Sequence, residues 1–303
     1  MAIPDYQTLM LPTLKVGATG VVHLKDATDM LSNEFNLSEE ERRQVLPSGN
    51  MATIRNRVGW AITYLIKAEL LTHPKRGYFT ITERGKKILS ENPDKINNKF
   101  LEQFPEFIEF KNKKKGDDES PGIPTEEASS ATPEERIGAA YSEITAEIRS
   151  EILSKVLDGS PEFFEKLIVS LLVAMGYGGS SSEAGKHLGK SGDGGIDGII
   201  NEDELGLDII YIQAKRYAPD NTIGRPEIQK FAGSLIGMGA NKGVFVTTSS
   251  FSSKASEYAK NIPQRIILID GDKLTSLMLS HNVGVRLHQA IELKKIDEDF
   301  FLE

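Results

Sequence analysis

The first third of the chain carries apolar residues at helical spacing, followed by two short strand-like runs. Over residues 51–69 the apolar positions recur three and four apart, which predicts a long helix with one buried face. Ser38 and Glu41 have the spacing of a capping box, so a shorter helix is predicted to begin there. Apolar runs on either side of a turn predict a β-hairpin over residues 70–81, with a further helix after it. Helices followed by such a hairpin predict a mainly α winged helix-turn-helix domain over residues 1–95.

Residues 137–303 show a different pattern, in which strand-like runs alternate with helical ones. A helix over 136–156 comes first. Ser160 and Pro161 then suit an N-cap and a first helical position, and they open a second helix. The elements that follow are strands at 196–200, 209–215, 243–248 and 265–270, and helices at 226–238, 252–261 and 272–280. This alternation predicts an α/β domain with an at least partly parallel sheet packed against helices.

Between the two halves lies a stretch with almost no large apolar side chain. From Lys111 the chain reads KNKKKGDDESPGIPTEEASSATPEER, with three prolines and Ile123 as the only large aliphatic residue. Such a segment cannot bury enough apolar surface to offset the entropy of ordering it. We therefore expect residues 96–136 to form an acidic, flexible linker.

Composition excludes several kinds of chemistry. The 303 residues contain no cysteine, which rules out disulfides, zinc–thiolate sites, iron–sulfur clusters and thiol nucleophiles. The five histidines lie far apart, so any metal is expected to be held by oxygen ligands. No run approaches the roughly 18 apolar residues of a membrane span, and the first residues lack the pattern of a secretory signal. We expect a cytoplasmic protein with no membrane partner.

The net charge of −8 hides a basic segment. Residues 51–100 carry ten Lys and Arg against four Asp and Glu, a net of +6, whereas residues 101–150 carry six against twelve, a net of −6. Screening confines surface fields to about 10 Å, so local charge matters more than the sum. DNA contacts are predicted on the long helix and at the hairpin tip, and the candidate residues are Arg55, Asn56, Arg57, Lys67, Lys75 and Arg76. The alternative is a dimerisation or protein-interaction module built from the same elements.

Polar residues on two strands of the second half could act together. In the strand 209–215, Gln213 and Lys215 point to the same face about 7 Å apart, because side chains alternate along a strand. A short connection to the preceding strand suits a hairpin, which would bring Asp197 beside them. Polar groups on an otherwise aliphatic strand pair are costly to bury without a use. The glycines before Asp197 lead into a strand, so a dinucleotide-binding loop is not expected, and Asp193 is interpreted as a turn residue.

These motifs resemble a known family of nucleases. GGIDG at 194–198, followed by YIQAKR at 211–216, resembles the catalytic signature of the Mrr-type restriction endonucleases. They form a branch of the PD-(D/E)xK superfamily, in which the motif of this chain reads D…QxK. The resemblance extends to MGYGG, GRPEIQKFAG, GVFVTTSSFSSKA and IDGDKL in the second half, and to RNRVGWA and RGYFTIT in the first. It implies a restriction-endonuclease-like α/β fold over residues 137–303, with a mixed sheet flanked by helices.

The resemblance also implies a metal-dependent site. Asp197 would be a direct ligand of Mg²⁺, a hard cation for which Mn²⁺ can substitute. Gln213 stands at the second acidic position of the motif, and the carbonyl of Ala214 would supply a further ligand. Lys215 would orient the attacking water and stabilise charge on the phosphate. Because glutamine leaves the site one negative charge short, Glu165 from the preceding helix is a candidate to supply it; the alternative is an ordinary glutamate at a helix border.

Thr247, Thr248 and Ser249 stand where a strand ends before a helix. Such a position suits backbone amides and hydroxyls that meet a phosphate, so Thr247 and Thr248 are candidate DNA contacts. Capping of the helix that follows Ser252 explains the same residues equally well. The sequence leaves both interpretations open.

By resemblance, the chain is expected to be an endonuclease of a type IV-like restriction system, which hydrolyses phosphodiesters in foreign, methylated double-stranded DNA. One such site cuts one strand, so a homodimer or a higher homo-oligomer is implied. Two other functions stay open. One is a catalytically silent DNA-binding regulator that keeps the nuclease fold, against which the retention of Asp197 and Lys215 argues. The other is a nuclease of DNA repair.

Overall fold

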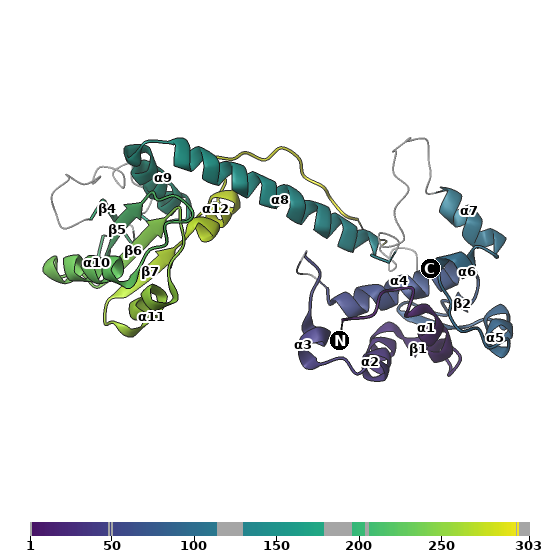
Figure 1. Ribbon diagram of the computed structural model, residues 1–303. Coiled ribbons are helices and arrows are strands. Elements are labelled where there is room, and N and C mark those ends of the chain that lie inside the picture. The colour runs from purple at the N-terminus through teal and green to yellow at the C-terminus, as the bar shows by residue number, and fades with distance from the viewer. Residues whose placement is uncertain are drawn as a thin grey trace. The chain divides into compact units, whose positions relative to one another are not determined.

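A computed structural model describes residues 2–47, 49, 51–113, 130–178, 196–203, 206–294 and 296, which fold into two compact units (Figure 1). The first unit comprises Met1–Glu143 and Lys295–Glu303, and the second comprises Ile144–Lys294. Helix α8 (Pro133–Asp158) contributes its first turns to the first unit and the remainder to the second. Within these described ranges, no helix is long and apolar enough to cross a membrane.

The first unit is mainly helical, as predicted. Its elements are α1 (Met10–Gly17), β1 (Val22–His23), α2 (Leu24–Glu34), α3 (Glu39–Arg43), α4 (Thr53–Lys67), β2 (Leu71–Thr72), β3 (Tyr78–Ile81), α5 (Glu83–Ser90), α6 (Asn98–Leu101) and α7 (Pro105–Lys113). The three strands form an antiparallel sheet in the order β1-β3-β2. The capping box of Ser38 and Glu41 opens α3 as expected, and the hairpin β2–β3 is also confirmed. Strand β1 was not predicted, because a strand of two residues is too short to show the alternation of apolar and polar positions by which strands are recognised.

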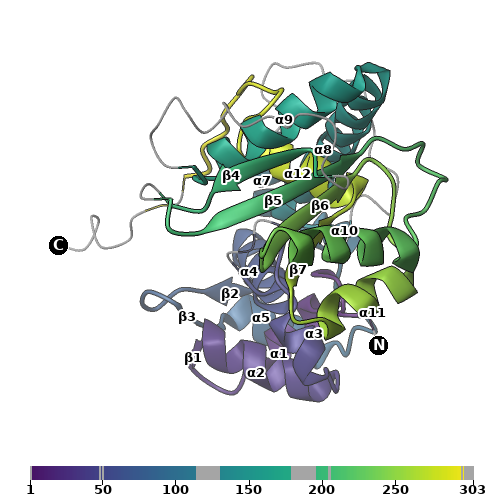
Figure 2. The same ribbon diagram turned by 90° about the vertical axis from the view of Figure 1, so that its left-hand side faces the viewer.

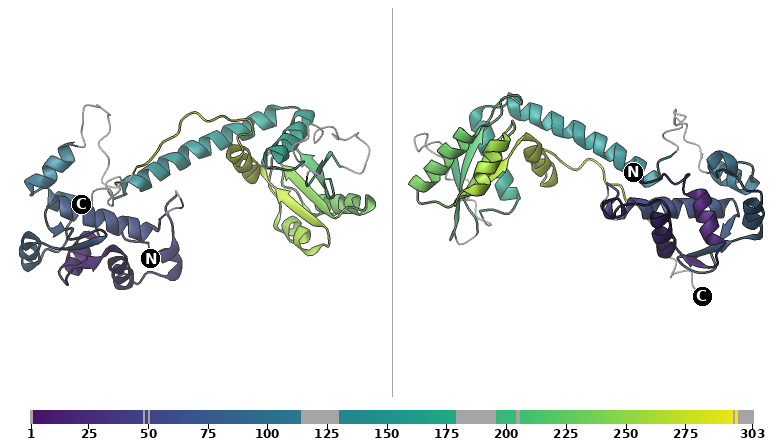
Figure 3. Two further views of the ribbon diagram at one scale, coloured as in Figure 1. Left: turned by 180° about the vertical axis from the view of Figure 1, so that it is seen from behind. Right: turned by 60° about the horizontal axis from the view of Figure 1, so that its bottom comes forward.

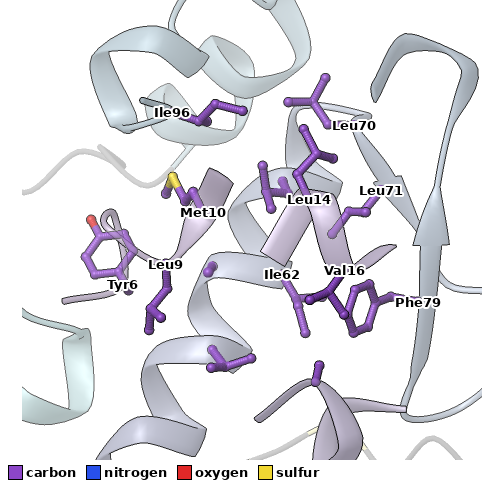
Figure 4. Close-up of a cluster of buried hydrophobic side chains, with 14 of the residues drawn as sticks. Tyr6, Leu9, Met10, Leu14, Val16, Ile62, Leu70, Leu71, Phe79 and Ile96 are labelled. Atoms are coloured by element: carbon purple, nitrogen blue, oxygen red, sulfur yellow. The ribbon is translucent and has the colours of Figure 1, made fainter. Parts of the chain in front are cut away.

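Helix α4 crosses the core of the first unit, of which Figure 4 shows a part. The apolar positions of its sequence are buried, as the spacing predicted, and they are Ile54, Val58, Ala61, Ile62 and Leu65. In Figure 4, Ile62 lies beside Val16 of α1 and Phe79 of β3. Burial of this stripe fixes which face of α4 packs on the core of the first unit.

The predicted linker is shorter than expected because both of its ends are folded. Four phenylalanines of α6, α7 and the turn between them pack in or against the core of the first unit, and they are Phe100, Phe104, Phe107 and Phe110. Arg84 of α5 binds both carboxylate oxygens of Glu106 on α7. At the other end, α8 begins at Pro133. Burial of these aromatic side chains stabilises α6 and α7 although the residues around them are mostly polar. The central part of the predicted linker, 114–129, lies outside the described residues.

The second unit is the predicted α/β domain. Besides α8, its elements are α9 (Pro161–Ala174), β4 (Gly198–Asn201), β5 (Ile209–Lys215), α10 (Arg225–Gly237), β6 (Lys242–Thr247), α11 (Ser253–Asn261), β7 (Arg265–Ile269) and α12 (Gly271–Ser280). The sheet has the order β4-β5-β6-β7; β4 is antiparallel to β5, and β5, β6 and β7 are parallel. The expected mixed sheet flanked by helices is therefore confirmed. The glycines 192–195 and Asp193 lie outside the described residues.

Helices cover both faces of this sheet (Figures 2 and 3). On one face α8, α9 and α12 form a core that contains Ile212 of β5, and on the other α10 and α11 pack around Phe245 of β6. Tyr211 packs against this second core. Because side chains alternate along a strand, Gln213 and Lys215 share the face of Tyr211, as expected.

Candidate active site and DNA-binding surface

Asp197 and Lys215 meet at the end of the β4–β5 hairpin. Asp197 directly precedes β4, and its backbone N–H donates to the carbonyl of Ile212 at 2.8 Å. Its Oδ2 accepts a hydrogen bond of 2.7 Å from the backbone N–H of Ala214. The Nζ of Lys215 lies 3.9 Å from the same oxygen, and the side chains of Lys215 and Asp197 are 27% and 18% exposed. The predicted juxtaposition is therefore present, and both charged groups remain accessible to a substrate.

Gln213 is the most buried polar residue of this strand. Its exposed fraction is 2%, and its Oε1 has no hydrogen-bond partner among the residues that the structure describes. A buried acceptor left unpaired costs about 1–3 kcal/mol. The amide oxygen is therefore suited to a bond with a group from outside the chain, such as a cation or an ordered water.

Glu165 lies on α9, which packs against β4 and β5. Burial raises the pKa of the Glu165 carboxyl, the charges of Asp197 and Glu162 raise this pKa further, and Lys215 lowers it. This coupling means that the carboxylate lies within electrostatic reach of Asp197 and Lys215. Sequence spacing on α9 left its position open, and the fold brings its charge within reach of Asp197 and Lys215, although α9 packs on the face of the sheet that carries Ile212 and not on the face of Gln213.

The oxygen atoms at this site suit a hard divalent cation. The described residues bond Asp197 through Oδ2, which leaves its Oδ1 for a cation, and Gln213 on the paired strand offers an unpaired Oε1. Carboxylate and amide oxygens are ligands that Mg²⁺ accepts. In the part of the chain that the structure describes, no group of three or more His, Asp or Glu side chains could hold a metal. Amide and backbone oxygens would therefore have to complete the ligand set.

Thr247 and Thr248 do not face outward, in contrast to their expected role as DNA contacts. Their exposed fractions are 0% and 1%. The hydroxyl of Thr247 donates to the carbonyl of Lys215 at 2.8 Å, and that of Thr248 donates to the carbonyl of Tyr217 at 2.6 Å. The alternative role, capping of α11, is wrong as well, because Ser252 caps that helix with its own side chain. Thr247 is engaged with the last residue of β5, and Thr248 with the backbone that follows it.

Arg216, which directly follows Lys215, was not considered at the level of sequence. Its Nη1 donates to the carbonyl of Leu157, the penultimate residue of α8. Its Nε is buried without a hydrogen-bond partner among the described residues. Its place beside Lys215 was the only signal in the sequence, and a charged residue at the end of a strand ordinarily indicates solvent exposure.

The candidate DNA contacts of the first unit fall into two groups. Arg55 and Lys67 on α4, and Lys75 and Arg76 in the β2–β3 turn, are exposed. The Nζ of Lys75 lies 4.0 Å from the ring centroid of Tyr78, which holds the ammonium at the turn. All four cations are exposed, as contacts with phosphates require.

Asn56 and Arg57 form the second group, and the structure contradicts their predicted exposure. Asn56 is 6% exposed, and its Oδ1 accepts a 2.7 Å hydrogen bond from the hydroxyl of Thr132. Arg57 forms a 2.7 Å ion pair with Glu135. The first turn of α8 and the residue before it thus cover this part of α4. The covering residues lie more than seventy positions along the chain, so the spacing within α4 could not reveal them.

The second unit combines a mixed four-stranded sheet, helices on both of its faces, and an aspartate held beside a lysine at the end of the second strand. Together these features define a nuclease of the restriction-endonuclease fold. Comparison with family models agrees, since the model described as restriction endonuclease matches residues 156–278, and that of the Mrr N-terminal domain matches residues 6–91. The type IV methyl-directed restriction enzyme EcoKMrr of Escherichia coli (strain K12) is 33% identical over 309 residues, covering 99% of this chain and 100% of that protein. The chain therefore belongs to the Mrr family of restriction endonucleases.

Two solved structures show lower similarity. The MspJI restriction endonuclease, in complex with a 27-mer oligonucleotide, is 21% identical with a TM-score of 0.33, over 55% of this chain and 37% of that one. The DNA modification-dependent restriction endonuclease AspBHI is 16% identical with a TM-score of 0.35, over 71% of this chain and 56% of that one. This chain spans less than two thirds of the length of either.

Proposed function

We propose that this nuclease is a Mg²⁺-dependent endonuclease that cleaves methylated double-stranded DNA in a type IV-like restriction system. The observation that carries the proposal is the buried, unpaired Oε1 of Gln213 on the strand whose backbone binds Asp197 and whose end presents Lys215. The methyl-directed activity of the Escherichia coli relative supports the choice of methylated DNA. The same family membership supports a cytoplasmic location, where foreign DNA is met.

The residues of the site have separate roles in this proposal. Asp197, the Oε1 of Gln213 and the carbonyl of Ala214 would hold Mg²⁺ or Mn²⁺. When bound there, the ion would supply positive charge for the scissile phosphate and would favour ionisation of a water. Lys215 binds a phosphate oxygen and orients the water. Glu165 contributes the negative charge that glutamine at position 213 lacks.

The first unit would hold the DNA while the second cuts it. Arg55, Lys67, Lys75 and Arg76 are exposed cations on α4 and the adjoining hairpin, in the positions of a recognition helix and a wing. Because one active site cuts one strand, cleavage of both strands requires two protomers, and we propose a homodimer or a higher homo-oligomer.

The deciding experiment incubates the purified full chain with methylated and unmethylated plasmid, with Mg²⁺, Mn²⁺ or EDTA. We expect cleavage of the methylated plasmid with either metal and none in EDTA. Asp197→Asn should abolish cleavage while DNA affinity stays within about twofold, since phosphate contacts on the first unit dominate binding. Full cleavage in EDTA, or by Asp197→Asn, would refute the proposed site.

A further inference from the structure

The pairing of β5 with β6 is interrupted directly after the candidate active site. The parallel register runs as far as Lys215 opposite Thr247, and it resumes only as an isolated bridge between Ile223 and Phe251. Between these points, residues 216–222 have left the sheet. Lys215 is therefore the last paired residue of its strand, a position at which strands readily fray.

Three successive side chains of the opposite strand end bond the segment where backbone pairing stops, and at the carbonyl of Lys215 they add to a 3.4 Å backbone bond from the N–H of Thr248. The hydroxyl of Thr247 donates to the carbonyl of Lys215, and that of Thr248 both donates to the carbonyl of Tyr217 and accepts from its N–H at 2.9 Å. The hydroxyl of Ser249 donates to the carbonyl of Asn221 at 2.7 Å. We name this set of residues 247–249 the hydroxyl ladder. It continues the β5–β6 contact across the interruption with side chains in place of amides.

These hydroxyls are shielded from solvent. Thr247, Thr248 and Ser249 are 0%, 1% and 5% exposed. Burying a hydroxyl without a partner is costly, so valine or alanine would be preferred here if the positions only filled the core. The backbone N–H of Ser249 even donates to the hydroxyl of Thr247 at 3.1 Å, which orients that oxygen toward β5. The ladder thus fixes the segment from Lys215 to Asn221.

We infer that the hydroxyl ladder, and Thr247 above all, positions Lys215 for phosphodiester hydrolysis; this inference rests on the proposed nuclease function. Lys215 is held from both sides, because its neighbour Ala214 bonds the carboxylate of Asp197 on one side and its own carbonyl is bonded by Thr247 on the other. Its Nζ lies 3.9 Å from Asp197, farther than a tight hydrogen bond, so that pair alone does not fix the ammonium. Thr247 is a positioning residue, since it acts through the backbone of Lys215.

The test replaces Thr247 with valine, which keeps the shape and removes the hydroxyl. We expect kcat for plasmid cleavage to fall about tenfold or more with KM unchanged, because a misplacement of the order of 1 Å is costly in catalysis. Thr247→Ser restores the hydroxyl and should recover most of the parent rate. The matched control is Thr275→Val on α12, a residue 2% exposed whose hydroxyl bonds the carbonyls of Gly271 and Asp272. The control should lower the melting temperature without lowering kcat.

Hydrogen exchange measured on the same folded proteins tests the ladder without any cleavage assay. The amides of Tyr217 and Asn221, which are hydrogen-bonded in the structure, should exchange about tenfold faster in Thr247→Val than in the parent or in Thr275→Val, since local opening follows the loss of local bonds. Ser249→Ala, a milder change, should accelerate exchange near Asn221 alone. The inference would be overturned if Thr247→Val and Ser249→Ala both exchanged at the parent rate. It would also be overturned if Thr247→Val kept the parent kcat. A parent chain that cuts no DNA would instead refute the proposed function, and the exchange data would still decide whether the ladder holds the segment.

Discussion

Gln213 is a residue that the stability of the fold does not explain. Its side chain is 2% exposed, and its amide oxygen has no hydrogen-bond partner among the described residues. The other buried residues of β5 are aliphatic. In folded proteins, buried polar groups are almost always hydrogen-bonded. The exceptions occur chiefly at functional sites. Asp197 and Lys215 lie on the same pair of strands, so this unpaired oxygen belongs to the strand that carries the charged candidate site.

Gln213→Glu tests whether this oxygen faces a cation. The new carboxylate is buried, so in EDTA its charge should lower the melting temperature below that of the parent. With Mg²⁺ the loss should be largely reversed, because the ion compensates the charge. The measurement is thermal unfolding with and without the metal, with Gln229→Glu at an exposed position of α10 as the control. If Mg²⁺ shifts both variants equally, the oxygen does not face a metal.

Glu165→Gln tests the helper carboxylate through stability as well as activity. The pKa of Glu165 is raised in the folded state by burial and by the charge of Asp197. A raised pKa in an acid contributes stability below its unfolded value, and this contribution is lost as the pH rises through the folded pKa. At pH 7 the variant should therefore be at least as stable as the parent, with the difference vanishing near pH 4. Cleavage should nevertheless fall about tenfold, and apparent Mg²⁺ affinity with it.

The control for that prediction is Glu257→Gln, which removes a charge from an exposed position on α11 that is not among the groups that shift the pKa of Glu165. It should leave the Mg²⁺ titration of cleavage unchanged. If the Mg²⁺ titration of Glu165→Gln matched the parent in midpoint and plateau, Glu165 would have no part in the active site and would be an ordinary glutamate at a helix border.

At the scale of elements, α4 shows how a segment distant in the sequence can cover a helix face that its own sequence predicts to be exposed. Its apolar stripe faces the core, yet part of its opposite side is covered as well. Trp60 donates a 2.6 Å hydrogen bond to Glu134, and Arg57 pairs with Glu135, so the acidic first turn of α8 lies where a basic helix would otherwise attract phosphate. Arg55 stays outside this contact.

Arg55→Ala and Asn56→Ala, one residue apart, should therefore have different effects. Loss of Arg55 should weaken DNA binding and make the salt dependence less steep by about one unit of slope. Loss of Asn56 leaves the buried O–H of Thr132 without its acceptor and should cost about 1–3 kcal/mol of stability, with DNA affinity within about twofold of the parent. Binding at several salt concentrations and thermal unfolding measure both. Equal losses of affinity would mean that DNA displaces the first turn of α8.

At the scale of the whole molecule, the chain has separate hydrophobic cores in its two units. The first is built around α4, and the cores of the second unit lie on either face of its sheet. A unit with its own core can unfold cooperatively by itself. This organisation suits a division between holding DNA and cutting it.

Calorimetry should accordingly resolve two unfolding transitions. Leu65→Ala in the first unit and Phe245→Ala in the second each remove a side chain that is 0% exposed, at a cost of about 2–5 kcal/mol. Each variant should lower the temperature of one transition and leave the other in place. A single transition lowered by both variants would show that the two units unfold as one.

The sequence by itself determined the local structure and the core of the candidate site. Helical and strand spacing predicted α4, α9 and β5 within one or two residues, and Ser160 caps its helix as its type and position required. Asp197 and Lys215 were placed together because a short hairpin joins adjacent strands. All of these depend on residues close in the chain, where periodicity and turn chemistry carry the information.

Only the tertiary structure decided which polar side chains stay outside. Asn56 and Thr247 look exposed by their type and spacing, yet Thr132 and the carbonyl of Lys215 bury them. The phenylalanines of α6 and α7, which were predicted to lie in a flexible linker, likewise pack in or against the core of the first unit. In each case the partner lies far along the chain, and a pattern within one segment records how side chains are spaced but not what another segment brings to meet them.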